Sequence, residues 1–203
     1  MSESNKFRKG NLGKKYTGPF RIHQRVINKK FDSGSFVAVQ FMGDIGEPKI
    51  PSDVITRVFD EIRDQPEVNF LLLTKSDEFY KEYMHEIPAN AICGITTETD
   101  KEIPRHISKA PNPQKRLDSL SWIKCYYPFL KTFVSVEPIM DFTDEFSEKI
   151  KKVEPWAVAV GYDNYKNKLP EPSLKKTEGL IKELEKFTKV YRKTIRESWG
   201  FEE

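Results

Sequence analysis

A chain of 203 residues with 37% hydrophobic residues is long enough to bury the core of one α/β domain. No window of the sequence approaches the ~18 apolar residues of a membrane span, and the basic N-terminus lacks the apolar segment of a secretory signal. These features exclude an integral membrane protein, and we expect a soluble, cytoplasmic one.

The formal net charge of +3 is unevenly distributed. Residues 1–31 hold nine basic residues against one acidic residue (+8), so the rest of the chain carries 3 − 8 = −5. A basic arm on an acidic body is typical of contact with nucleic-acid phosphates, although a solvated tail has the same composition. The candidate phosphate-binding residues of this arm are Lys6, Arg8, Lys9, Lys14 and Lys15.

Strand and helix patterns then alternate in chain order. Apolar runs at 36–41, 70–74, 91–96, 131–136 and 156–160 predict five strands, and 188–191 is a candidate for a short last strand. Amphipathic patterns predict helices at 51–65, 76–85, from 112 onward, from 143 onward and after the proline-rich 169–172. Repeated βα units with apolar strands indicate a parallel sheet covered by helices. We expect a basic arm at 1–18, one domain at 19–195 and a tail at 196–203.

The two cysteines are 32 positions apart. Cys93 falls in an apolar strand and Cys125 in a helix pattern, so we expect both to be small buried hydrophobic residues. Neither cysteine has a C-x-x-C partner and the three histidines are scattered, so the sequence predicts no metal site.

Polar residues follow the end of each predicted strand. Parallel α/β sheets place function at the carboxyl ends of their strands, so these residues are candidates for a ligand site. Loops are polar in any protein, and Ser76 is explained as a helix cap, so a purely structural role is the alternative. The candidate ligand-binding residues are Met42, Gly43, Asp44, Thr74, Lys75, Thr97, Glu98, Ser135, Glu137 and Gly161.

Three of these residues are carboxylates, namely Asp44, Glu98 and Glu137. They converge on one face if the sheet curls into a barrel. Carboxylates placed together serve acid–base chemistry or bind a cation or an amine. They also cap backbone amides at strand ends, and Lys75, beside them at the end of the second predicted strand, would neutralise one of them. Spacing alone does not separate these roles.

Several sequence strings resemble a known family. These strings are Met-Gly-Asp at 42–44, Thr-Thr-Glu at 96–98, Ile-Ser-Lys-Ala-Pro-Asn-Pro at 107–113, Val-Ser-Val-Glu-Pro-Ile-Met-Asp-Phe at 134–142 and Leu-Pro-Glu-Pro-Ser at 169–173. Over roughly residues 17–195 the chain resembles a poorly characterised, phage-associated family of the radical S-adenosylmethionine (SAM) superfamily.

The resemblance implies a partial six-stranded βα barrel. In the superfamily, a C-x-x-x-C-x-x-C loop after the first strand holds a [4Fe–4S] cluster that binds SAM. A Gly-Gly-Glu-like motif after the second strand contacts the methionine amino group. Residues 42–44 resemble that motif, with Asp44 one methylene shorter than glutamate. Thr97 and Glu98 correspond to positions of polar SAM contacts, and Ser135 and Glu137 follow at the next strand end.

The chain departs from this pattern at the cluster, because no cysteine precedes Cys93. We therefore expect an incomplete, TIM-like βα barrel with a radical SAM-like core that lacks its first strand. Two distant cysteines do not supply the three or four thiolates of a [4Fe–4S] cluster. The expected function is binding of a nucleotide-like ligand such as SAM, or of a macromolecular partner, without radical chemistry by this chain alone.

Three alternatives follow from the missing segment and the arm. An open barrel edge favours a homodimer or a partner chain that covers it. A cluster segment upstream or on another chain would make the protein part of a radical SAM enzyme. The basic arm would instead serve a module that binds nucleic acid or a host factor, with aromatic residues near it for base stacking.

Overall fold

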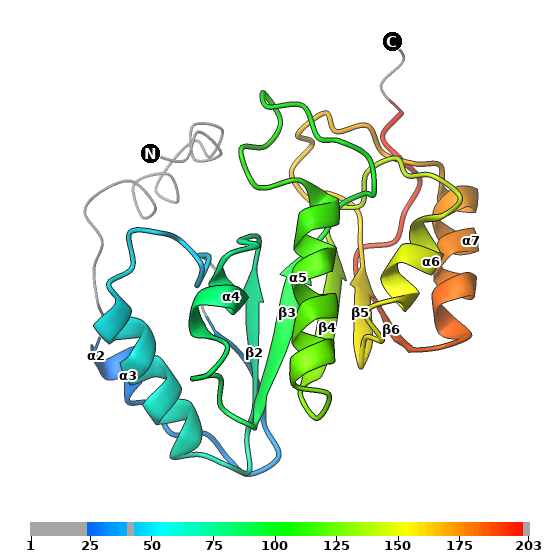
Figure 1. The fold of residues 1–203 in the computed structure, drawn as a ribbon. Helices are drawn as coiled ribbons and strands as arrows, with labels where there is room; N and C mark the ends of the chain where they lie inside the picture. Colours follow the sequence, from blue (N-terminus) through cyan, green and yellow to red (C-terminus); the bar gives the residue numbers. More distant parts are fainter. Residues whose placement is uncertain (1–23, 40–42, 201–203) are drawn as a thin grey trace.

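The computed structural model describes residues 24–39 and 43–200 (Figure 1). Six parallel strands form one sheet in the order β1-β2-β3-β4-β5-β6, so each strand pairs with its neighbours in sequence. The strands are β1 (Phe36–Val39), β2 (Asn69–Thr74), β3 (Ala91–Thr96), β4 (Lys131–Val136), β5 (Ala157–Val160) and β6 (Lys189–Arg192). The helices are α2 (Gln24–Ile27), α3 (Ser52–Arg63), α4 (Phe79–Tyr83), α5 (Pro113–Tyr126), α6 (Phe146–Lys151) and α7 (Leu174–Glu185).

The sequence pattern therefore predicted the α/β class and the parallel sheet correctly. All five clearly predicted strands are present, and the candidate last strand is β6. The starts of α5 and α7 also follow the sequence, whereas α4 and α6 begin at Phe79 and Phe146, later than the predicted starts at 76 and 143. The Asn112 side chain caps α5 by accepting a hydrogen bond from the backbone N of Gln114 (2.8 Å), and Ser173 caps α7 by accepting one from the backbone N of Lys176 (3.2 Å).

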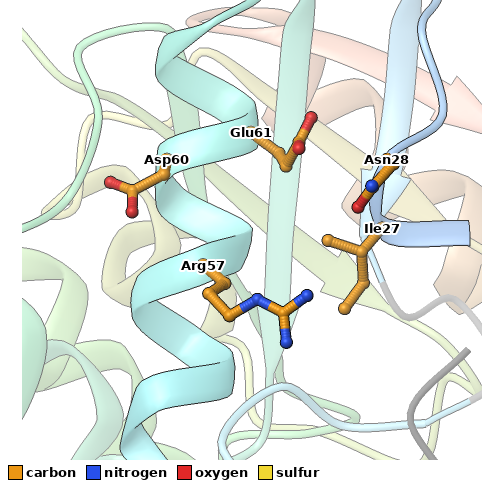
Figure 2. Close-up of a pocket in the computed structure, with 5 residues that line it drawn as sticks. All are labelled: Ile27, Asn28, Arg57, Asp60 and Glu61. Atoms are coloured by element: carbon orange, nitrogen blue, oxygen red, sulfur yellow. The ribbon is translucent and has the colours of Figure 1, made fainter. Parts of the chain in front are cut away.

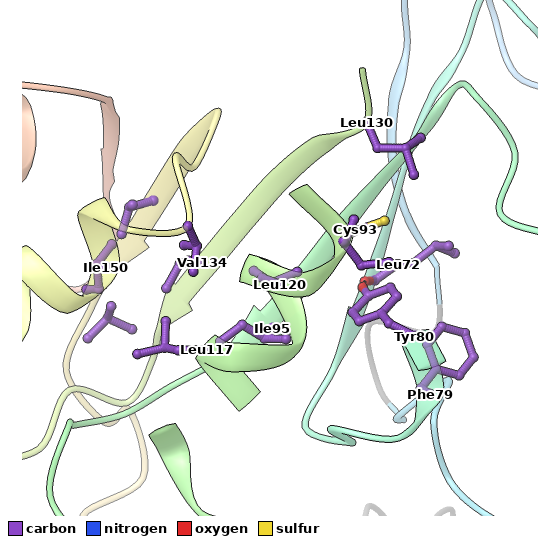
Figure 3. Close-up of a cluster of buried hydrophobic side chains, with 14 of the residues drawn as sticks. Leu72, Phe79, Tyr80, Cys93, Ile95, Leu117, Leu120, Leu130, Val134 and Ile150 are labelled. Carbon is purple, nitrogen blue, oxygen red and sulfur yellow. The ribbon is translucent and has the colours of Figure 1, made fainter. Parts of the chain in front are cut away.

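Helices α3 to α7 lie on one face of the sheet (Figure 1). Side chains of the helix-facing strand positions pack with these helices into the main core, and Figure 3 shows part of it. On α4, Tyr80 is fully buried and donates its hydroxyl proton toward the carbonyl oxygens of Leu72 and Gly94. The strand residues of this core are Phe70, Leu72, Ala91, Cys93, Ile95, Val134, Val136, Val158 and Val160.

The opposite face of the sheet has its own, smaller apolar cluster. Because side chains alternate along a strand, the residues between those of the main core point to this second face. Five of them are buried and pack with the half-buried Leu73 and Tyr191. The five are Leu71, Ile92, Phe133, Ala157 and Ala159.

The sheet is curled into a half-barrel with this second face on its concave side. The rings of Phe36, at the start of β1, and Trp156, just before β5, stack with centroids 6.2 Å apart. In a flat sheet, four inter-strand steps of about 4.8 Å would separate β1 from β5 by about 19 Å. The contact between the two rings therefore reflects strong curvature at the amino-terminal ends of the strands.

One expectation about the cysteines is confirmed and the other is wrong. Cys93 is fully buried in β3, as expected. Cys125 is exposed. Ile123 is the last buried residue of α5, and Cys125 lies two positions later. Two residues turn an α-helix by about 200°, which places Cys125 on the opposite, solvent-facing side.

The segment after β6 packs against the domain. The guanidinium of Arg196 pairs with the buried carboxylate of Glu171 (2.6 Å) and lies over the ring of Trp199 (3.5 Å to the centroid). The backbone N of Trp199 donates to the same carboxylate (2.9 Å). These contacts fix residues 196–199 beside the loop that precedes α7. Within the described residues, each helix is too short or too polar to cross a bilayer.

Candidate functional site at the carboxyl edge of the sheet

The carboxyl edge of the sheet brings together most of the site residues predicted from the sequence. Each of β1 to β5 ends there with at least one of them, because all strands run in the same direction. The predicted residues on this edge are Gly43, Asp44, Thr74, Lys75, Thr97, Glu98, Ser135, Glu137 and Gly161. Met42 and the arm residues Lys6, Arg8, Lys9, Lys14 and Lys15 lie outside the described residues.

Asp44 connects the loop after β1 to the end of β2. Its carboxylate accepts hydrogen bonds from the backbone N of Gly46 (2.9 Å), the hydroxyl of Thr74 and the backbone N of Lys75 (2.8 Å). A β-carbon added at Gly46 would lie 2.5 Å from the Thr74 hydroxyl oxygen, so this close approach requires glycine. Asp44 and Thr74 thus have structural partners, which is the capping role that the sequence left open.

Glu98, after β3, is the most enclosed carboxylate of the edge. Only 3% of the residue is exposed, and its oxygens pair with Nζ of Lys75 and with Nη1 of Arg116 (3.0 Å). Burial alone would raise the pKa of the Glu98 carboxyl group, but the two cations together outweigh burial and lower the pKa below its ordinary value. Glu98 is therefore a buried carboxylate that stays ionised.

Arg116 on α5 is the residue of this site that the sequence analysis missed. It is fully buried, and its Nη1 also donates to the carbonyl oxygen of Thr96 at the end of β3. Its Nε and Nη2 have no hydrogen-bond partner among the described residues. The sequence does contain a signal. Arg116 lies three, four and seven residues before the core positions Ser119, Leu120 and Ile123, so it belongs to the buried face of α5.

Glu137 follows β4 and is half-buried. Ser135 donates a hydrogen bond to its carboxylate (3.2 Å). Burial raises the pKa of Glu137, and the hydrogen bond from Ser135 and the charge of Lys193 offset only part of this effect. A β-carbon added at Gly161 would lie 3.2 Å from Oε1 of Glu137 and 2.9 Å from Cβ of Lys193, so glycine leaves the space that this carboxylate occupies.

Thr97 plays a structural part at the edge. It is fully buried, its backbone N donates to the carbonyl oxygen of Ser135 (2.8 Å), and its hydroxyl donates to the carbonyl oxygen of Thr99 (2.9 Å). These bonds tie the end of β3 to β4 and to the loop that follows. Thr97 thereby holds its neighbour Glu98 in position.

Two carboxylates with different environments therefore lie on adjacent strand ends. Glu98 is held ionised by two cations, whereas Glu137 has a raised pKa and a hydroxyl donor beside it. The two carboxylates follow neighbouring strand ends, since the register pairs Thr96 of β3 with Ser135 of β4. An arrangement of cations, carboxylates and an adjoining apolar surface suits a small zwitterionic ligand with an aromatic part.

The two cysteines do not form a thiolate site at this edge. Cys93 points into the helix-facing core, and burial raises the pKa of its thiol to about 12. Cys125 lies near the end of α5. Three or four thiolates close together are needed for a [4Fe–4S] cluster, so these two residues do not fit that group. Within residues 24–39 and 43–200, no three histidine, cysteine or acidic side chains are grouped to hold a metal ion.

Two surface hollows lie beside the helices of the molecule. Figure 2 shows one of about 210 Å³, which is lined by Arg57, Asp60 and Glu61 of α3 and by Ile27 and Asn28 at the end of α2. The other, of about 330 Å³, lies between the start of α4 and the first turns of α5. Both are lined mainly by charged residues and contain none of the predicted site residues.

The fold and the edge define an α/β half-barrel protein with a polar carboxyl edge. Residues 4–163 match the model of a family described as protein of unknown function (DUF5131), and the chain belongs to this family. The matched region contains β1 to β5 and the site residues from Gly43 to Gly161. A comparison with curated proteins gives no match.

Proposed function

We propose that this protein is a radical SAM-like half-barrel that binds a nucleotide-like ligand, SAM or a close analogue, at its carboxyl edge. The observation that carries the proposal is the ionised Glu98 held by Lys75 and Arg116, with Glu137 on the adjacent strand end. In this proposal β1 takes the place of the second strand of the superfamily core, because Gly43 and Asp44 follow it.

The chemistry of SAM supports the choice of ligand. SAM carries an ammonium group, a carboxylate and a sulfonium cation on one part and adenine on the other. Glu137 offers negative charge to the ammonium or sulfonium group, while Glu98 holds Lys75, whose side chain is 37% exposed and offers a cation to the carboxylate. The apolar concave face offers a surface for the adenine ring. The proposal is limited to binding, since the cysteines of the chain do not fit an iron–sulfur cluster.

Calorimetric titration tests the proposal. The full chain is titrated with SAM and separately with 5′-deoxyadenosine, which shares the nucleoside but lacks the charged amino-acid part. We expect saturable binding of both, with SAM tighter because only SAM reaches the charged groups of the edge. Glu137→Gln and Lys75→Met should each weaken SAM binding at least about tenfold, which corresponds to the loss of one charge-assisted hydrogen bond.

The controls separate a site from a general effect on folding. Lys175→Gln changes an exposed lysine of α7 and should leave binding unchanged. Asp44→Ala removes the tie between the β1 loop and β2, so its effect reports on the shape of the edge. The proposal is contradicted if neither compound binds, or if all variants bind SAM with the affinity of the unchanged chain.

A further inference from the structure

The amino-terminal edge of the sheet carries a group of exposed aromatic residues. Five large hydrophobic side chains are exposed among the described residues, and four of them lie at the start of a strand or in the segment that leads into one. Because the strands are parallel, these starts share one edge, opposite the proposed SAM site. The four residues are Phe36, Tyr126, Phe129 and Trp156.

Two of these residues form a flat aromatic platform. Phe36 and Trp156 stack with ring centroids 6.2 Å apart and an interplanar angle of 20°, and they remain 49% and 37% exposed. An exposed pair of nearly parallel rings costs hydrophobic free energy when it faces water. The same rings offer a surface on which a further flat, apolar group can stack.

Lysines without an acidic partner lie beside the platform. Nζ of Lys131 is 5.4 Å from the centre of the Trp156 ring, and Nζ of Lys189 is 4.6 Å from the centre of the Tyr191 ring. No carboxylate of the described residues forms an ion pair with either lysine. Glu154, two residues before Trp156, pairs with Lys124 (3.9 Å). Lys131 also donates a hydrogen bond to Oδ1 of Asn69 (3.3 Å). The edge therefore combines exposed rings with two lysines that have no acidic partner among the described residues.

The basic segment of the chain joins the fold at this same edge. The ring of Phe31 packs against Phe70 near the start of β2, with centroids 6.0 Å apart. Residues 1–31, with nine basic residues and one acidic residue, thus lead to within five residues of Phe36.

We propose that Phe36, Trp156, Lys131 and Lys189 form a surface that binds single-stranded nucleic acid. Bases would stack on the platform, and the lysines would contact the backbone phosphates, which is how sequence-tolerant single-strand binding works. A second copy of the chain fits less well, because a two-fold contact would bring the unpaired lysines of both copies together. This surface is independent of the ligand at the carboxyl edge.

Fluorescence anisotropy with a labelled oligothymidylate and the full chain tests this surface. Base–aromatic stacking is worth about 1–3 kcal/mol per base, so Trp156→Ala should weaken binding about 5- to 150-fold. Lys131→Gln should lower the slope of log affinity against log salt by about 0.7, the value for one phosphate contact on a single strand. Lys131→Gln leaves the aromatic pair intact and keeps the test valid if Trp156→Ala does not fold.

Matched controls lie on other parts of the molecule. Tyr165→Ala changes an aromatic residue that is 72% exposed on the loop after β5, and Lys175→Gln changes an exposed lysine of α7, so both should bind as the unchanged chain does. The proposal is overturned if the chain does not bind the oligonucleotide. It is also overturned if only substitution of the arm residues 6–15 weakens binding, or if sedimentation shows a dimer that Trp156→Ala dissociates.

Discussion

At the scale of single residues, the carboxyl edge depends on how three charges compensate one another. Glu98 is buried, and the cations of Lys75 and Arg116 contact different oxygens of its carboxylate. Buried ion pairs contribute little net stability, yet the loss of one partner is costly because the other charge stays buried. The network therefore contributes mainly by fixing the position of the Glu98 carboxylate and of the Lys75 ammonium group, and less by stabilising the fold.

Removal of Arg116 tests this compensation. Arg116→Met should lower the free energy of unfolding at neutral pH by about 3 kcal/mol, because Glu98 would keep only Lys75 as a partner. Urea unfolding measures the change. In a Glu98→Gln background the same substitution should cost at least about 1 kcal/mol less, since the charge to be compensated is gone. Additive effects of the two substitutions would show that Arg116 and Glu98 are not coupled.

Glu137 gives the site a dependence on pH. Its pKa in the folded chain is raised above the ordinary 4.5, chiefly by burial. Between these two pKa values the folded state binds more protons than the unfolded state, so Glu137 makes the free energy of unfolding fall as the pH rises through that window. Glu137→Gln removes this contribution. Relative to the unchanged chain, the variant should gain stability as the pH rises from the ordinary pKa of 4.5 through the raised one, which unfolding curves across that range would measure.

At the scale of elements, the ends of β4, β5 and β6 fit together only because Gly161 has no side chain. A β-carbon there would lie 2.9 Å from Cβ of Lys193 and 3.3 Å from the backbone N of Thr194. The glycine on α7 is different, since a β-carbon at Gly179 would meet no atom within 4 Å. The two glycines form a natural pair for comparison.

Separate substitution of each glycine by alanine should change the free energy of unfolding in opposite directions. Gly161→Ala should destabilise the fold by about 1–3 kcal/mol through overpacking and should displace Glu137. Gly179→Ala should stabilise it by about 0.5–1 kcal/mol, because alanine is the better helix former. Thermal or urea unfolding of the two variants measures both effects. If both variants change the free energy of unfolding equally and in the same direction, the space around Gly161 can accommodate a β-carbon and the argument is contradicted.

Elements and side-chain partners differ in how far the sequence predicts them. Strands and helices follow from local apolar patterns and caps such as Asn112, so the class, the strands and the starts of α5 and α7 were predictable. The partners of the edge residues join positions distant in sequence, such as Asp44 with Lys75 and Arg116 with Glu98. No local pattern encodes these contacts. The exposure of Cys125 follows from its position on the solvent-facing side of α5, which its apolar neighbours in sequence do not indicate.

At the scale of the whole molecule, the half-barrel has two ends with different chemistry. The carboxyl edge carries the compensated charges around Glu98 and the carboxylate of Glu137. The amino-terminal edge carries exposed rings and lysines that form no ion pair among the described residues. In the described residues β1 pairs only with β2, and β6 pairs only with β5, so each has one open side. A homodimer or a partner chain at an open side remains a prediction, which sedimentation of the full chain addresses.

The central claim is that the carboxyl edge is a ligand site. A crystal structure of the full chain grown with SAM tests it most directly. The proposal predicts SAM beside Glu98 and Glu137, with its carboxylate near Lys75 and its adenine against the concave apolar face. Density for SAM at another place, or an edge without SAM under conditions in which calorimetry shows binding, would contradict it.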